Sequence, residues 1–206
     1  LAYVIKTGGS ANYKLTTDIY LNHPDKIDWS TGTASSGYTP NVWYTTNTAG
    51  NFYGTLDGDG HTIYGLYVNN TEDCITALIP GLRINQPTVV KNLGIDKAYI
   101  GTAGKAAAFI SQTNYNNTVT ISCCYVGEEV TIKGTHAAAM LAYSGSNFSI
   151  DSCYSLATIS GATLYGFVAD SWASSRAISN CYYVGTTLSS KGGSRSIVST
   201  NVYGEN

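Results

Sequence analysis

The sequence predicts an all-β protein, a right-handed single-stranded parallel β-helix (a solenoid) of roughly six to seven rungs. Two sequence markers support this class, because each recurs at a nearly constant spacing along the 206 residues. A third observation is the β-branched and aromatic content of the repeated segments, which favours strands over helices. Self-similarity at a fixed period is typical of proteins that stack one coil of chain on the next.

The first marker is a six-residue pattern with apolar first and fourth positions. Its fourth residues are spaced by 27, 31, 29 and 28 and are Leu66, Leu93, Cys124, Cys153 and Cys181. The residue before each is small or an amide, namely Gly65, Asn92, Cys123, Ser152 and Asn180. Gly and Asn accept a left-handed backbone at little cost. The pattern therefore predicts a one-residue corner between two short strands, with the fourth-position side chains stacked in an inward spine.

The second marker lies about half a period later. Its central residues are spaced by 31, 31, 27 and 30 and are Leu78, Phe109, Met140, Phe167 and Ile197. A coil of this length, with three short strands and three turns, closes into one rung of a β-helix. Equivalent residues then stack at roughly 4.8 Å, the spacing of neighbouring strands.

Length indicates one domain covering residues 1–206. We assign residues 1–51 to an irregular first rung and a capping loop, and residues 52–206 to regular rungs. Charged residues make up 12% of the chain and the net charge is -2, which argues against binding to nucleic acid or to a membrane surface. No apolar run is long enough to insert into a bilayer. The sequence opens in a strand-like segment, so we expect no signal peptide in it and interpret it as a module of a larger secreted or cell-surface protein.

The five cysteines are expected to be free thiols rather than disulfides. Three of them share the inward spine, where a thiol behaves as a small apolar residue. Zinc is the alternative, but a linear ladder does not provide tetrahedral ligands. The three histidines are scattered, and we predict neither a metal site nor a cofactor.

Residues 22–51 form a long segment that is rich in turn formers and aromatic residues. Such a segment in a compact domain usually covers other structure or carries function. One interpretation is a lid over the N-terminal end of the core. The other is an aromatic loop that stacks on sugars or docks a peptide, through Trp29, Trp43 and Tyr44.

A turn with alternating acidic residues follows at Asp57-Gly58-Asp59-Gly60. It resembles the start of a calcium loop but lacks the later Glu, so a tight turn explains it better. The surrounding segment, residues 52–66, together with Asn92-Leu93 and Asn180-Cys181-Tyr182, resembles the GLUG-type repeats of bacterial surface proteins. This resemblance implies a right-handed parallel β-helix in a secreted, modular protein, often beside dockerins or adhesin-like modules. It implies no catalytic residues.

Catalysis on a glycan would need two carboxylates across the scissile bond. The outward position after the first apolar residue of the marker contains a single acid, Asp151. Asp96 and Glu128 follow strands near a corner but have no evident partner there. We therefore predict no catalytic residues, while a domain that cleaves pectin-like polysaccharide stays open as an alternative.

The outward position after the fourth residue is more informative. It contains Tyr67, Gly94, Tyr125, Tyr154 and Tyr182. Such a column either stabilises the solenoid by ring stacking or offers aromatic surfaces to a linear glycan. We predict a non-catalytic binding or adhesion module that recognises polysaccharide, in a cellulosome-like or other modular protein. Its expected ligand-binding residues are Trp29, Trp43, Tyr44, Tyr67, Tyr125, Tyr154 and Tyr182. A structural spacer or protein-docking element is the remaining alternative.

Overall fold

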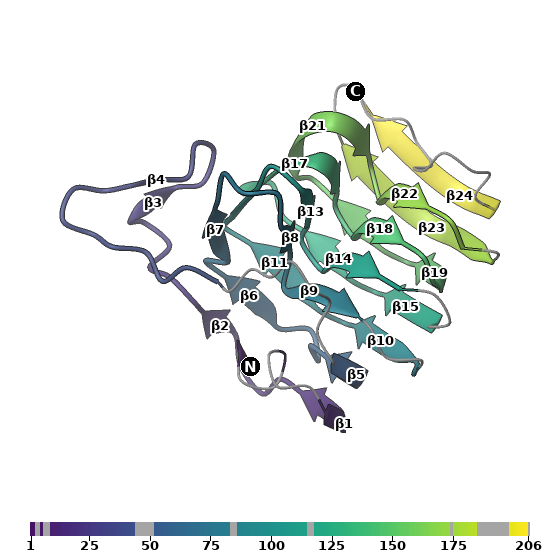
Figure 1. The fold of residues 1–206 in the computed structure, drawn as a ribbon. Coiled ribbons are helices and arrows are strands. Elements are labelled where there is room, and N and C mark those ends of the chain that lie inside the picture. Colours follow the sequence, from purple (N-terminus) through teal and green to yellow (C-terminus); the bar gives the residue numbers. More distant parts are fainter. Residues whose placement is uncertain are drawn as a thin grey trace.

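The computed structural model describes residues 1–2, 5, 9–43, 52–82, 86–114, 118–173, 175–184 and 198–205. Within these ranges the assigned elements are strands, and strands of successive coils pair in parallel to form a β-solenoid (Figure 1). The predicted fold class, an all-β parallel β-helix, is confirmed. About four turns are complete, fewer than predicted, because the first and last coils contribute strands to only some of the faces.

Two faces form one 12-stranded sheet, because β23 and β24 run through the corner between them. Face A consists of β1 (Gly9–Lys14), β5 (Phe52–Asp57), β10 (Thr88–Lys91), β15 (Thr118–Ser122), β19 (Asn147–Asp151) and the first parts of β23 (Arg176–Val184) and β24 (Val198–Glu205). Face B consists of β2 (Ile19–Tyr20), β6 (Thr62–Tyr64), β11 (Gly94–Asp96), β16 (Tyr125–Val126), β20 (Tyr154–Ser155) and the second parts of β23 and β24.

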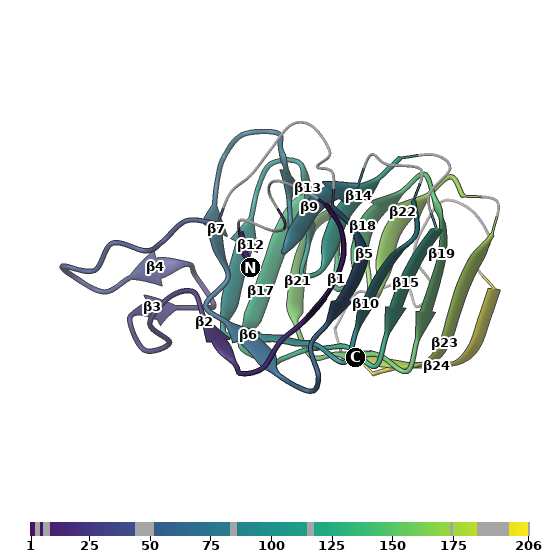
Figure 2. The same cartoon turned by 90° about the horizontal axis from the view of Figure 1, so that it is seen from below.

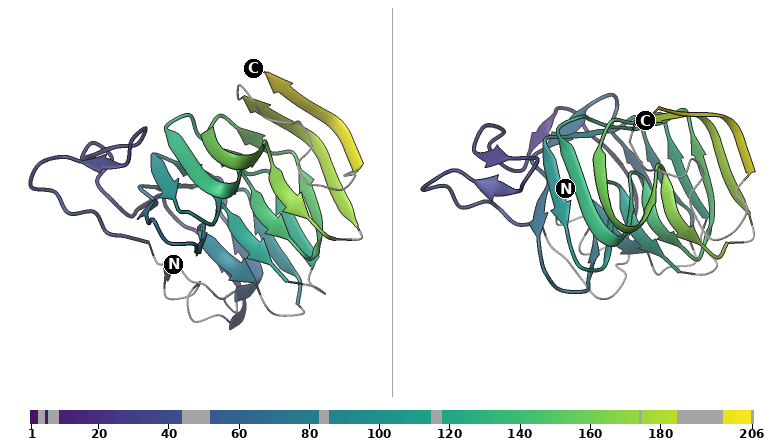
Figure 3. Two further views of the ribbon diagram at one scale, coloured as in Figure 1. Left: turned by 45° about the horizontal axis from the view of Figure 1, so that its top comes forward. Right: turned by 90° about the horizontal axis from the view of Figure 1, so that it is seen from above.

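Two further faces close the coil. Face C consists of β7 (Tyr67–Asn69), β8 (Ile75–Thr76), β12 (Ala98–Gly101), β13 (Lys105–Ala107), β17 (Val130–Ala138) and β21 (Thr158–Tyr165). Face D consists of β9 (Ile79–Leu82), β14 (Ile110–Thr113), β18 (Leu141–Ser144) and β22 (Val168–Ser171). Each complete coil thus has four or five strands, not the three that were predicted. Strand β17 pairs with both β12 and β13, and Figure 3 shows the long strands curving around the stack.

The predicted one-residue corner joins face A to face B. Its residues have φ values of 51° to 53° and are Asn92, Cys123, Ser152 and Asn180. On either side of it the side chains alternate between the core and solvent, as in the burial pattern of β15. The left-handed conformation explains why small and amide residues recur there.

The earliest copy of the first marker was assigned to the wrong corner. Gly65, with φ of 79°, lies opposite Lys97 at the corner between faces B and C, and its N–H donates to the Lys97 carbonyl at 2.8 Å. Leu66 therefore stacks on the coil of Ala98 and not on Leu93, and Tyr67 pairs with Tyr99. The cause is a longer turn: residues 58–61 separate β5 from β6, whereas two residues connect β10 to β11, β15 to β16 and β19 to β20.

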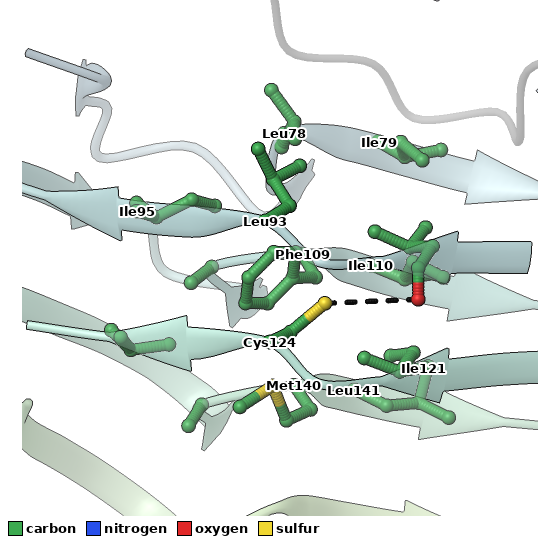
Figure 4. Close-up of a cluster of buried hydrophobic side chains, with 14 of the residues drawn as sticks. Leu78, Ile79, Leu93, Ile95, Phe109, Ile110, Ile121, Cys124, Met140 and Leu141 are labelled. Carbon is green, nitrogen blue, oxygen red and sulfur yellow. Dashed lines mark hydrogen bonds between the residues drawn. The ribbon is translucent and has the colours of Figure 1, made fainter. Parts of the chain in front are cut away.

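The other predicted columns are confirmed. Register places Leu93, Cys124, Cys153 and Cys181 in one spine, and each of them is at most 2% exposed. Figure 4 shows Cys124 beside the second column, in which Leu78, Phe109 and Met140 follow one another in successive coils. Phe167 continues this column, and Ile197 lies outside the described residues.

The cysteines of the spine are free, as predicted. The Cys153 sulfur accepts the backbone N–H of Cys124 at 3.4 Å, and the Cys181 sulfur accepts that of Cys153 at 3.4 Å. The thiol contact with Cys124, together with burial, raises the pKa of Cys153 to about 12. Contact with Cys153 and burial likewise raise the pKa of Cys181. Cys74 is also buried, whereas Cys123 is exposed at its corner.

A short arm projects from the N-terminal end of the stack (Figures 1 and 2). It contains the antiparallel pair β3 (Ile27–Asp28) and β4 (Thr33–Ala34). Its inner side packs on face C, where Ile27, Trp29, Tyr67 and Tyr99 form a buried cluster. The segment that follows the arm returns to the core, because Trp43 is buried there and its backbone N–H donates to the Tyr67 carbonyl at 2.8 Å. This segment therefore packs against the first complete coil, while residues 44–51 lie outside the described residues.

Candidate functional site

A column of tyrosines stands on the outward side of face B. The register pairs Gly94 with Tyr125, Tyr125 with Tyr154, Tyr154 with Tyr182, and Tyr182 with Tyr203. The residues before Gly94, Tyr125, Tyr154 and Tyr182 are buried in the core, and the alternation of face B therefore directs these three rings outward. Four tyrosines thus occupy equivalent positions in consecutive coils.

The Tyr125 ring leans toward the N-terminal end of the stack. A Cβ atom on Gly94 would lie 2.4 Å from the Tyr125 ring, so this ring lies over the glycine. The Tyr125 hydroxyl is 2.6 Å from Thr62 Oγ1, in the coil beyond Gly94. The ring of Tyr154 follows it in parallel, with centroids 5.1 Å apart and an interplanar angle of 8°. Because the strand spacing nearly equals the ring spacing, the rings overlap with an offset, the geometry that aromatic pairs prefer.

A second stacked pair extends the aromatic surface. Tyr20 and Tyr64 are register partners in β2 and β6, with centroids 4.9 Å apart and an interplanar angle of 12°. Tyr64 precedes the corner residue Gly65, so this pair lies one outward position further along face B than Tyr125. We call Tyr20, Tyr64, Tyr125, Tyr154, Tyr182 and Tyr203 the tyrosine face.

The tyrosine face is the main exposed apolar surface among the described residues. Six large hydrophobic side chains are exposed among the described residues, and four of them lie on face B: Tyr20, Tyr154, Val184 and Tyr203. Tyr203 is 64% exposed, Tyr20 62% and Tyr154 42%. Contiguous exposed apolar surface marks binding sites more often than scattered residues do. Burial raises the pKa of Tyr125, so its hydroxyl is protonated at neutral pH and can both donate and accept a hydrogen bond.

Tyr67 does not belong to this column. It lies on face C and is 8% exposed, and its hydroxyl donates to the Gly32 carbonyl at 2.9 Å. Its ring contacts Tyr99, with centroids 6.2 Å apart. The position that Tyr67 was predicted to occupy is held by Thr62.

The aromatic residues of the N-terminal segment are also packed away. Trp29 is 5% exposed and its indole N–H donates to the Pro24 carbonyl at 2.8 Å. Trp43 is 6% exposed and its indole N–H donates to the Leu78 carbonyl at 3.1 Å. Tyr44 lies outside the described residues. Both tryptophan rings are thus packed against the protein, whereas Tyr125, Tyr154 and Tyr182 lie on the outward side of face B.

The turn at Asp57 and Asp59 is held by hydrogen bonds and lysines. The Asp57 carboxylate accepts the Asp59 N–H at 2.9 Å and the Asn92 amide at 3.0 Å, and it lies 3.1 Å from Lys91 Nζ. Asp59 pairs with Lys14 at 2.8 Å. No group of three or more metal-ligating side chains occurs in the described part of the chain. The tight-turn interpretation therefore accounts for these contacts.

Carboxylates approach one another where the arm meets the solenoid. Lys97 Nζ lies 3.7 Å from an Asp25 oxygen and 3.5 Å from a Glu129 oxygen, beside a groove of about 390 Å³. Both carboxylates are largely exposed and share this lysine, an arrangement that holds the arm against face C. Asp96 is directed over Gly127 and accepts the Lys97 N–H at 2.8 Å. Asp96 and Glu128 are thus not placed as a facing pair.

Asp151 is the centre of a hydrogen-bond network at the corner between faces A and B. It accepts from Ser179 at 2.6 Å, from Ser152 at 2.9 Å and from Asn180 at 2.9 Å. These contacts, led by that of Ser179, lower the pKa of the Asp151 carboxyl. The Asp59 N–H, Asn92 and Lys91 similarly lower the pKa of Asp57.

These two carboxyls predict a loss of stability in acid. A folded-state pKa below the unfolded value contributes stability that is complete above the ordinary value of 3.8 and is lost as the pH falls through the folded-state pKa. We expect the urea concentration at the unfolding midpoint to decrease as the pH is lowered from 4.5 to roughly 2. The decrease should be smaller in the Asp57→Asn/Asp151→Asn variant. If the urea midpoint depended on pH equally in the wild type and the variant, Asp57 and Asp151 would not be the source of the acid sensitivity.

Sequence reasoning missed three members of the tyrosine face. Tyr203 follows Val202 as Tyr182 follows Cys181, a signal that a search for the apolar-Tyr pair in the last coil would have found. Tyr20 and Tyr64 give no comparable signal, since their stacking depends on the pairing of the short strands β2 and β6.

Comparison with known proteins does not extend these observations. No family model, no curated protein and no solved structure matches the chain. No helix in the described ranges has the length and apolar character needed to cross a membrane.

Proposed function

We propose that this chain is a non-catalytic binding module that recognises polysaccharide through the tyrosine face. The observation that carries the proposal is the alignment of tyrosine rings in consecutive coils of one face, exposed at Tyr154 and Tyr203 and partly exposed at Tyr125 and Tyr182. A row of this kind repeats a similar contact along the solenoid axis, which suits a linear polymer better than a compact ligand. Phenolic hydroxyls along the row supply hydrogen bonds, and the outer parts of the rings supply apolar contact.

The setting that we propose is extracellular. The low charge, the abundant Ser, Thr and Asn, and the resemblance to GLUG-type repeats support a secreted or cell-surface protein, in which other modules accompany this one. A single shallow face binds weakly, and several modules on one chain or one surface raise the avidity. This would suit adhesion to a plant or host polysaccharide.

Affinity electrophoresis on a panel of soluble glycans tests the proposal. We expect at least one glycan to retard the wild-type protein, and the Tyr154→Ala/Tyr182→Ala variant to bind it about tenfold more weakly, which corresponds to roughly 1.4 kcal/mol. Trp172→Ala is the matched control, because Trp172 is 48% exposed but lies outside face B. The expected result is retardation of this control equal to that of the wild type.

Two outcomes would replace the proposal. Unchanged migration on all glycans, with a lower unfolding midpoint for the double variant, would assign the tyrosines to stabilisation and favour a structural spacer. Release of reducing or unsaturated ends from a pectin-like glycan would favour the enzymatic alternative, with the acidic groove beside Lys97 as the first place to examine.

A further inference from the structure

A depression lies at the N-terminal end of the tyrosine column, where Gly94 interrupts it. Its volume is about 270 Å³, and its lining includes Asp59, Gly60, Asn92, Gly94, Cys123 and Tyr125. This is roughly the volume of nine water molecules, below the range of drug-sized pockets. It has room for one sugar ring.

Two local features of the sequence create this depression. Gly94 has no side chain, so face B is low at this point and the Tyr125 ring leans over it. The turn between β5 and β6 is longer than the corners that follow it, and Asp59 and Gly60 form the opposite wall. The left-handed conformation of Asp59, with φ of 53°, and its contact with Lys14 hold this wall in place. The depression is thus part of the folded framework.

The lining combines an aromatic wall with polar groups. Tyr125 supplies the ring and a hydroxyl that is fixed by Thr62, while Asp59 supplies a carboxylate and Asn92 an amide. A planar apolar wall beside a few hydrogen-bonding groups is the usual composition of a small-molecule site. The charged group in the lining is the Asp59 carboxylate, and its partner Lys14 is not part of the lining, so an anionic sugar would meet a carboxylate and no cation there.

We propose that this depression is the anchoring subsite of the tyrosine face and holds one neutral pyranose residue of the bound glycan. The inference rests on the proposed function and adds the place and the charge of the ligand. The sugar ring lies against Tyr125, with Asp59 and Asn92 bonding its hydroxyls. The rest of the glycan continues over Tyr154 and Tyr182 toward the C-terminal end.

Cys123 provides a direct probe of the depression. It lines the depression and is exposed, whereas the other four cysteines are buried. Under native conditions we therefore expect one thiol to react rapidly with N-ethylmaleimide. Saturating hexasaccharides of xylose, glucose or mannose, whichever the electrophoresis identifies, should slow this reaction at least threefold. A hexamer of galacturonic acid should leave the rate unchanged.

The reverse experiment tests blockage. The maleimide adduct at Cys123 is expected to weaken retardation by the same glycan at least tenfold, while maleimide treatment of Cys123→Asn leaves the retardation of that variant as it was before treatment. Asparagine suits the site because Asn92 and Asn180 occupy the equivalent corners. Asp59→Asn keeps the turn and is expected to restore binding of the uronic acid hexamer in part.

The outcomes separate the two proposals. Retardation by a neutral glycan, with neither protection of Cys123 nor blockage by the adduct, would overturn the subsite and leave the tyrosine face as the binding surface. Protection by the uronic acid hexamer would overturn the assignment of a neutral sugar. Absence of retardation by every glycan would overturn both.

Discussion

Replacement of Phe109 by alanine is expected to lower the free energy of unfolding by about 3–5 kcal/mol. Phe109 is fully buried and stacks between Leu78 and Met140 of the neighbouring coils, beside Cys124 (Figure 4). In a solenoid each coil contacts only its neighbours, so the cavity removes contacts from two interfaces at once. The paired strands above and below limit how far the site can collapse around the smaller side chain.

Urea unfolding followed by circular dichroism measures this effect. Gln112→Ala is the matched control, since Gln112 lies in β14, the strand that follows Phe109, and its side chain is partly exposed. Its substitution is expected to change stability by less than about 0.5 kcal/mol. Met140→Leu preserves volume in the same column and should cost less than about 1.5 kcal/mol. A loss below about 1 kcal/mol for Phe109→Ala would mean that the column is not closely packed.

The inward columns could be predicted from the sequence because each coil buries side chains at the same positions. Every inward position contacts its equivalent one coil away, so apolar residues must recur at the coil length, as at Phe109 and Cys124. The left-handed corner was predictable for a similar reason, because only a few residue types tolerate it at Asn92 and Asn180. These signals depend on local backbone geometry and on burial, and both restrict the residue types that can occur at a position.

The register of the first complete coil could not be predicted in the same way. The pattern at Ile63 fits either corner, because an apolar-polar-glycine sequence is compatible with any left-handed bend. The choice depends on the turn at residues 58–61, whose length is not constrained by the core. Once that turn takes four residues, Tyr67 moves from the tyrosine column to face C, where the arm covers it.

The candidate site was predicted in part. Tyr125, Tyr154 and Tyr182 were found because outward positions also repeat with the coil. The burial of Trp29 and Trp43 could not be inferred. A loop sequence contains the same aromatic residue types whether these residues bind a ligand or pack against a face of the solenoid. The depression at Gly94 could not be predicted either. In the sequence Gly94 is a gap in a column, and the walls come from the position of the Tyr125 ring and from the turn at Asp59.

The bend of face C leads to the second large prediction, that Gly161→Ala lowers the free energy of unfolding by roughly 3 kcal/mol or more. Gly161 is in register with Gly134, where β17 and β21 curve around the stack. A Cβ atom at Gly161 would lie 1.7 Å from the Gly134 carbonyl oxygen, and φ at Gly161 is 154°. This oxygen belongs to the backbone of the paired strand β17, so the clash can be removed only if the two coils move apart.

Gly37→Ala separates this clash from the effect of backbone conformation alone. Gly37 has φ of 77° and no atom within 4 Å of an added Cβ, so alanine there should cost only about 1–2 kcal/mol, the strain of the left-handed region. Urea unfolding of both variants gives the comparison. Similar losses at the two glycines would show that the coils can move apart at β21 and that the close approach at Gly134 does not constrain the bend. A much larger loss at Gly161 would assign the curvature of face C to this pair of glycines, since no residue with a side chain fits between the two strands.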